Sequence, residues 1–132
     1  MATTILLVDD HPLFRKGLRL LLEEQADFRI VGEAGDGRKA IELVRNLSPE
    51  VVIMDITMPE FNGIEATREI VSEHPSAKVV ALSMHSGKSF VEGMLKAGAA
   101  GYILKKSVPE DLVNAIRMVI QGDIYLTAIQ EF

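Results

Sequence analysis

The 132-residue sequence contains no cysteine and no tryptophan. The lack of cysteine excludes disulfide bonds and thiolate metal ligands. No apolar run approaches the roughly 20 residues of a membrane-spanning helix, and the opening Met-Ala-Thr-Thr shows no basic segment of a signal peptide. The chain also has no excess of positive charge, because its formal net charge is −5. This charge argues against the chain binding a nucleic-acid phosphate backbone by itself. These absences favour a cytoplasmic protein that binds neither a membrane nor DNA on its own.

Apolar residues make up 48% of the chain and charged residues 25%, which at this length is typical of one globular domain with its own core. Five short, β-branched apolar runs recur at regular intervals, and segments with helical periodicity separate them. This alternation predicts an α/β fold, with a parallel sheet and helices on both faces. The predicted strands are Ile5–Val8, Phe28–Val31, Val51–Met54, Val79–Leu82 and Tyr102–Leu104, and the predicted helices are Pro12–Glu24, Asp36–Leu47, Asn62–His74, Ser86–Ala97 and Pro109–Gln121.

The tail from Asp123 to Phe132 is too short to be a domain and rather apolar for a disordered end. We interpret residues 1–122 as the domain. The tail is then either a frayed terminus or the start of a linker.

Polar side chains follow four of the five predicted strands. Asp9 and Asp10 follow the first, Asp55 the third, Ser83 the fourth and Lys105 the fifth. The carboxyl ends of parallel strands meet at one edge, where ligands of open α/β sheets bind. One polar residue at a strand end would merely mark that end, but four coincident ends favour a functional site.

Three carboxylates at one edge need nearby positive charge, since otherwise at least one pKa would rise sharply. Lys105 supplies one charge and a divalent cation would supply two more. Oxygen ligands favour Mg²⁺, with Mn²⁺ also possible. An aspartate beside such a cation and a lysine can attack phosphorus and form an acyl phosphate. Asp55 is the best candidate, because it stands alone at the end of a central strand, and Ser83 could donate a hydrogen bond to the phosphoryl group.

Together these motifs resemble the receiver domain of bacterial two-component response regulators. The acidic pair lies in "LLVDDHP", the acceptor in "VVIMDITMPEFNGIEATREI", the hydroxyl in "VVALSMHS" and the lysine in "AAGYILKKSVPEDL". The segments "DDHP", "LSMH" and "GYILKKSVPEDL" most resemble those of NarL/FixJ-type regulators. The resemblance extends from Ile5 to about Gln121. It implies a flavodoxin-like, doubly wound sheet of five strands in the order 2-1-3-4-5, with five helices.

The resemblance implies that Asp55 receives phosphate from a sensor histidine kinase. Asp10, Asp55 and the backbone carbonyl of Thr57 would then ligate Mg²⁺, with Asp9 acting through water. The family's lysine corresponds to Lys105 by its distance from the aromatic residue of the fifth strand, although a second lysine, Lys106, follows it where many receivers have proline.

The resemblance also implies a switch. Ser83 would move toward the phosphoryl group and the ring of Tyr102 would swing inward, which changes the surface of the fourth helix, fifth strand and fifth helix. Thr57 and His85 occupy positions that tune hydrolysis of the acyl phosphate in relatives. Packing of Tyr102 in the core, without a switch role, is the alternative. His11 is either a metal ligand or proton shuttle, or a solvent-facing residue at the start of the first helix.

NarL/FixJ-type proteins carry a helix-turn-helix domain after a linker, so the resemblance implies DNA binding only through a C-terminal domain absent from this chain, and a homodimer is possible. The chain would be a self-phosphorylating signalling domain that controls transcription, and not a turnover enzyme. The rival is an Mg²⁺-dependent phosphohydrolase, which often has a second aspartate where this chain has Thr57. A degenerate receiver that only binds protein is disfavoured by the complete set of site residues. The basic residues Arg15, Lys16 and Arg19 form either a kinase-docking surface or a solvated face.

Overall fold

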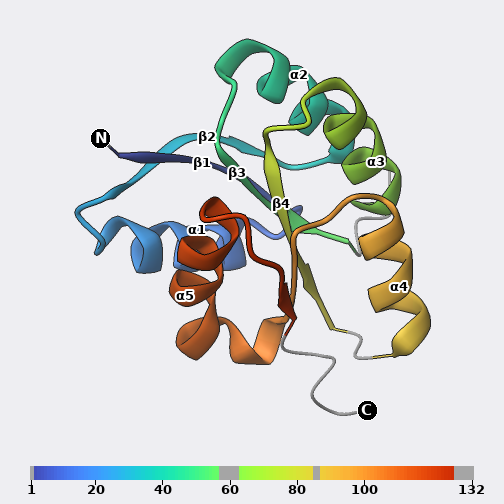
Figure 1. Ribbon diagram of the computed structural model, residues 1–132. Coiled ribbons are helices and arrows are strands. Elements are labelled where there is room, and N and C mark those ends of the chain that lie inside the picture. Colours follow the sequence, from blue (N-terminus) through green and yellow to red (C-terminus); the bar gives the residue numbers. More distant parts are fainter. Residues whose placement is uncertain (1, 57–62, 85–86, 127–132) are drawn as a thin grey trace.

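The computed structural model describes residues 2–56, 63–84 and 87–126 (Figure 1). They form a parallel sheet in the order β2-β1-β3-β4-β5-β6, so the predicted α/β fold and 2-1-3-4-5 order are confirmed, with one strand added. Within these residues no helix is long and apolar enough to cross a membrane. The strands are β1 (Thr3–Val8), β2 (Phe28–Ala34), β3 (Val51–Asp55), β4 (Lys78–Ser83), β5 (Gly101–Leu104) and β6 (Tyr125–Leu126), and the helices are α1 (Pro12–Glu23), α2 (Gly37–Leu47), α3 (Gly63–Glu73), α4 (Lys88–Lys96) and α5 (Val108–Ile120).

Helices α1 and α5 cover one face of the sheet, and α2, α3 and α4 cover the other (Figure 1). Each face has its own apolar cluster. Because successive strand residues point to opposite faces, Leu6 and Val8 belong to the cluster under α2–α4, whereas Ile5 and Leu7 belong to the cluster under α1 and α5. The inner strands are buried on both faces, which explains why they read as continuous apolar runs.

The ends of helix α2 follow the chemistry of its flanking residues. Asp36 is the N-cap, and its Oδ1 accepts a hydrogen bond from the Lys39 N–H at 2.8 Å. The C-cap Ser48 adopts a left-handed conformation with φ of 46°. Pro49 follows directly and cannot continue the helix. These local signals set where α2 begins and ends.

The tail contributes a short strand that the sequence analysis did not predict. Tyr125 and Leu126 form strand β6, parallel to β5 and opposite Gly101 and Tyr102. The Tyr125 hydroxyl donates a hydrogen bond to Asp111 Oδ1 of α5 at 3.1 Å. The apolar start of the tail is thus part of the sheet, an arrangement that a two-residue run cannot predict. Residues 127–132 lie outside the described part of the chain.

Gly63, the first residue of α3, packs against the end of β3. A Cβ atom here would lie 2.5 Å from the Cα of Ile56 and 2.7 Å from the carbonyl oxygen of Asp55. Backbone atoms cannot move aside cheaply, so Gly63→Ala is expected to lower the free energy of unfolding by about 3 kcal/mol. Urea unfolding measures this change.

Gly17→Ala is the matched control, because a Cβ atom on this α1 residue meets nothing within 4 Å. Alanine is the better helix former, so this variant is expected to gain about 1 kcal/mol. A Gly63→Ala protein as stable as the wild type would show that the start of α3 does not pack as closely against the end of β3 as described.

Candidate functional site

The carboxyl ends of three strands bring two aspartates and a lysine together. Asp55 is the last residue of β3, Asp9 follows β1, and both side chains are fully buried. Lys105 follows β5, and its Nζ lies 3.4 Å from Asp9 Oδ2 and 3.3 Å from Asp55 Oδ2. The lysine therefore bridges two buried carboxylates that would otherwise repel each other.

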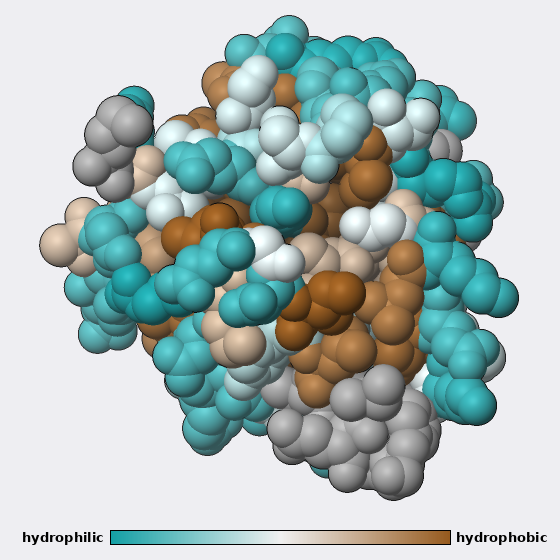
Figure 2. Space-filling model, viewed as in Figure 1, coloured by the Kyte–Doolittle hydropathy of each residue, from teal (hydrophilic) through white to brown (hydrophobic). Residues whose placement is uncertain are grey.

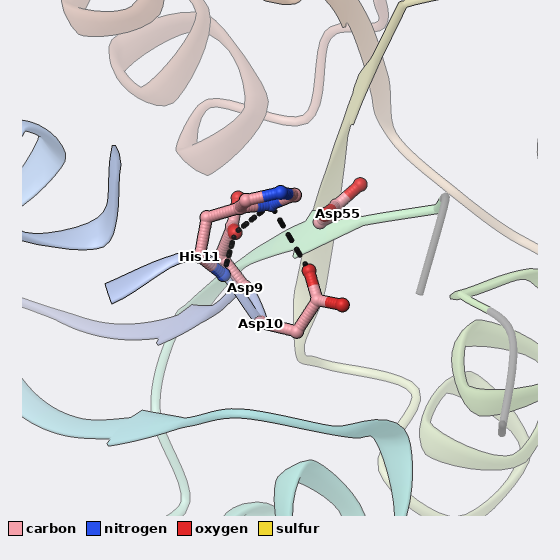
Figure 3. A group of neighbouring side chains, drawn as sticks. All are labelled: Asp9, Asp10, His11 and Asp55. Carbon is pink, nitrogen blue, oxygen red and sulfur yellow. Dashed lines mark hydrogen bonds and ion pairs between the residues drawn. The ribbon is translucent and has the colours of Figure 1, made fainter. Parts of the chain in front are cut away.

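Four side chains form a possible cation site at this rim (Figure 3). Asp9, Asp10, His11 and Asp55 each offer a ligand atom, and these atoms all lie within 4.8 Å of one another. Asp10 Oδ1 is enclosed and accepts no hydrogen bond from the described residues, although His11 Nδ1 lies 3.2 Å away and pairs with it when the imidazole is protonated. An enclosed carboxylate oxygen without a hydrogen bond is costly, and oxygen ligands of this kind suit a hard divalent cation. The residues therefore fit Mg²⁺.

His11 is exposed to solvent and also lies beside the acids. Its side chain is 69% exposed, yet Nδ1 lies 3.2 Å from Asp10 Oδ1 (Figure 3). Its backbone N–H donates a hydrogen bond to Asp9 Oδ1 at 2.7 Å. The backbone contact fixes the direction of the Asp9 carboxylate, whereas the imidazole covers the acids from the solvent side.

Burial raises the pKa of Asp9 above its ordinary value of 3.8. Loss of hydration disfavours the charged form most, and the negative charge of Asp55 acts in the same direction. The hydrogen bond from His11 and the positive charge of Lys105 oppose the shift. The raised pKa of Asp9 agrees with the expectation that the clustered carboxylates require nearby positive charge.

This raised pKa predicts how Asp9→Asn changes stability with pH. The folded protein holds the Asp9 proton more tightly than the unfolded chain, so the free energy of unfolding falls as pH rises from 3.8 to the folded pKa. Asparagine removes this loss. We expect Asp9→Asn to be more stable than the wild type at neutral pH in metal-free buffer, with the gain shrinking toward about pH 4. Urea unfolding across this range measures the difference.

Asp27→Asn is a control with the opposite sign. The hydrogen bond from Arg117 lowers the pKa of Asp27, an exposed residue. Its stabilising effect is present above 3.8 and is lost as pH falls through the lower, folded pKa. The Asn variant should therefore lose stability at neutral pH. A gain for Asp9→Asn that does not depend on pH would contradict the electrostatic explanation.

Ser83 and Tyr102 lie on the adjacent strands β4 and β5, and both are fully buried. A side-chain hydrogen bond joins them. Burial raises the pKa of Tyr102, and the bond to Ser83 partly offsets that effect. The ring is directed inward in this structure, and Tyr102 also pairs through its backbone position with Leu126 of β6.

Of the remaining candidate residues, the structure describes the two lysines but not Thr57 and His85. Lys105 faces the acids, with its side chain 11% exposed, whereas the neighbouring Lys106 is exposed to solvent. The geometry therefore selects Lys105. Thr57 and His85, the residues proposed to tune hydrolysis, lie outside the described residues.

A mainly apolar groove of about 850 Å³ opens beside this rim, between α1 and α5. Leu13 is 84% exposed and Met84 is 71% exposed at its edge. The sequence analysis did not predict this groove, because it depends on how α1 and α5 pack beside each other on the sheet. The lining residues are His11, Leu13, Phe14, Gly17, Leu18, Leu21, Met84, Lys105, Val108 and Pro109.

The basic residues of α1 are less available than their sequence position suggests. Arg15 Nε donates to Glu33 Oε1 at 2.8 Å, and Arg19 Nη1 donates to Glu33 Oε2 at 2.6 Å. These bonds fasten α1 to β2, so Arg15 and Arg19 act within the chain. Lys16 remains exposed on the helix.

A doubly wound sheet with aspartates and a lysine at its carboxyl rim defines the receiver class of α/β domains. The response regulator receiver domain profile matches residues 5–117, and the chain belongs to this family. It is 43% identical over 122 residues to the transcriptional regulatory protein DegU of Brevibacillus brevis, covering 92% of this chain and 52% of that protein. It is 40% identical over 124 residues to the response regulator UvrY of Escherichia coli K12, covering 94% and 57%. The chain thus spans about half the length of these curated relatives.

Solved structures agree with this assignment. A two-component response regulator of the LuxR family from Aurantimonas sp. SI85-9A1 superposes with a TM-score of 0.95 at 39% identity, covering 99% of this chain and 95% of that one. The isolated receiver domain of RcsB from Salmonella enterica serovar Typhimurium, solved in the presence of the phosphomimetic BeF₃⁻, gives a TM-score of 0.90 at 26% identity, covering 99% and 98%. The predicted family is therefore confirmed.

Proposed function

We propose that Asp55 accepts a phosphoryl group from a sensor histidine kinase in an Mg²⁺-dependent reaction. The observation that carries this proposal is the position of Lys105, whose Nζ lies 3.3 Å from Asp55 Oδ2 at the end of a central strand. A fixed positive charge beside a buried carboxylate is suited to phosphoryl transfer, in which positioning and charge neutralisation supply most of the catalysis.

The reaction is a displacement at phosphorus. An Asp55 carboxylate oxygen forms the new bond to phosphorus, while the bond from phosphorus to the donor's imidazole nitrogen breaks. The imidazole leaves with the electron pair, and the product is an acyl phosphate on Asp55. The Lys105 ammonium stabilises the negative charge on the transferred oxygens. Because Asp55 is fully buried, little bulk water competes with its carboxylate for the phosphoryl group.

Asp10, Asp55 and the backbone carbonyl of Thr57 would hold Mg²⁺ or Mn²⁺, with Asp9 acting through water. The enclosed Asp10 Oδ1 supports the metal role of Asp10. The part of Thr57 rests on the family resemblance. When bound, the cation adds positive charge next to the phosphoryl oxygens.

We infer that the groove between α1 and α5 receives the kinase. His11, Met84 and Lys105 line the groove, and Lys105 also contacts Asp55. A helix in the groove could therefore bring a phosphohistidine to the acceptor. Because Arg15 and Arg19 are engaged by Glu33, apolar contact rather than charge would dominate docking.

The switch proposal places the output on the surface of α4, β5 and α5. Ser83 and Tyr102 link the acceptor rim to β5, and hydrophobic residues are visible between α4 and α5 (Figure 2). Phe90 of α4 is 40% exposed and Ile124, just before β6, is 61% exposed. Phosphorylation would shift the population of this surface between two arrangements, and a homodimer could form through it.

The role in transcription is a proposal about a longer protein. The relatives are about twice as long as this chain, and RcsB, with 26% identity, has been solved bound to DNA. The net charge of −5 makes direct DNA binding by this chain unfavourable. We therefore assign DNA binding to a further C-terminal domain.

Intact mass spectrometry after incubation with phosphoramidate tests the acceptor function. The protein should gain one PO₃ group with Mg²⁺ and none with a chelator. The rival, a phosphohydrolase, predicts steady release of inorganic phosphate from small phosphomonoesters. Such turnover without a phosphorylated protein would reject the signalling role.

A further inference from the structure

Lys105 has a third contact that the proposed chemistry does not use. Its Nζ lies 4.7 Å from the centre of the Phe14 ring on α1. An ammonium within about 6 Å of a ring face is attracted by the ring quadrupole, most strongly where water is partly excluded. The Lys105 side chain is 11% exposed, so this condition is met.

Several contacts hold the part of α1 that carries the Phe14 ring against the sheet. Phe14 packs against the apolar cluster under α1 and α5. The adjacent Arg15 is bound to Glu33 of β2 and also donates a hydrogen bond to the backbone oxygen of Asp9. The ring is therefore fixed relative to the acids.

A lysine has a long flexible stem, and its position between two carboxylates depends on their charge. Bound metal or phosphate changes that charge, whereas the attraction to a neutral ring remains. We propose that Phe14 is a positioning residue for phosphoryl transfer, whose ring holds the Lys105 ammonium beside Asp55. This inference rests on the proposed acceptor function of Asp55.

Phe14 also lines the groove assigned to the kinase, so the test must separate positioning from docking. Phosphoramidate is a small donor that does not need the groove. A residue that only contacts the kinase would leave the rate with this donor unchanged. A residue that positions Lys105 affects the rate with either donor.

The kinetic test compares Phe14→Leu with the wild type, using phosphoramidate and saturating Mg²⁺. Phosphorylation should slow about fivefold, the factor expected for one partly desolvated cation–π contact. Phe14→Tyr should keep the rate, because it keeps the ring face. In a Lys105→Ala background, Phe14→Leu should have no further effect. An equal slowing in that background would overturn the proposal.

Phe28→Leu is the matched control, since the Phe28 ring makes the same type of contact with Arg117, at 4.8 Å, outside the acidic rim. This variant should phosphorylate at the wild-type rate.

A spectroscopic test needs neither donor nor metal. In the wild type, the ring current of Phe14 should shift the Lys105 ε-methylene protons upfield, and Phe14→Leu should abolish this shift. A Lys105 resonance unmoved by Phe14→Leu overturns the positioning role even where Asp55 is phosphorylated. Failure of the acceptor function would leave this measurement interpretable, so the two proposals fail separately.

Discussion

Asp55→Asn is expected to abolish phosphorylation by phosphoramidate or a histidine kinase. The amide carries no negative charge and is a far weaker nucleophile than a carboxylate. Asp9, another aspartate of this rim, already accepts a hydrogen bond on each carboxylate oxygen, from the His11 N–H on Oδ1 and from Lys105 on Oδ2. Intact mass should therefore show no added PO₃ group at any time at which the wild type is fully modified.

Asp36→Asn is a suitable control for this change. Asparagine caps helices as well as aspartate does, so α2 should keep its first turn and the variant should be phosphorylated like the wild type. Labelling of Asp55→Asn to the wild-type extent would show that another residue accepts the phosphoryl group.

Asp10→Ala is expected to weaken Mg²⁺ binding at least about tenfold. Mutating a residue that hydrogen-bonds to a metal ligand typically weakens metal affinity about 10–100-fold. Loss of a charged oxygen that contacts the cation itself should weaken the affinity by at least as much. The change also removes the enclosed Asp10 Oδ1, whose neighbour His11 Nδ1 lies 3.2 Å away. Isothermal titration with MgCl₂ measures the affinity.

Asp123→Ala removes the same charge from an exposed position beyond α5, and it should leave Mg²⁺ affinity unchanged. This control separates the loss of a ligand from the loss of overall negative charge. An Asp10→Ala affinity equal to that of Asp123→Ala would place the cation elsewhere.

The sequence was sufficient for the alternating α/β fold, because each inner strand is a continuous apolar run and several helices have a clear start or stop signal. Pro49 and the N-cap Asp36 are examples of such local signals. Strand β6 could not be predicted, because Tyr125 and Leu126 are defined as a strand only by pairing with β5. The close packing of Gly63 on β3 also depends on tertiary structure, and glycine in a helix start gives no sequence signal for it.

In the site, too, some features follow from the sequence and others only from the tertiary structure. Asp9, Asp55 and Lys105 are predictable as a group, because strand ends of a parallel sheet share one edge. The contact between Phe14 and Lys105 was not predictable, since it depends on the angle at which α1 crosses the sheet. The engagement of Arg15 and Arg19 by Glu33 likewise removes two residues from the basic surface that the helix pattern suggested.

The central claim is that Asp55 carries the phosphoryl group, and chemical trapping tests it most directly. Borohydride reduces an acyl phosphate to an alcohol, so phosphorylated aspartate becomes homoserine, which peptide mass spectrometry can locate. After treatment with phosphoramidate and Mg²⁺, we predict homoserine at position 55 and none after treatment with a chelator. Homoserine at position 9 or 10, with Asp55 unchanged, would contradict the account.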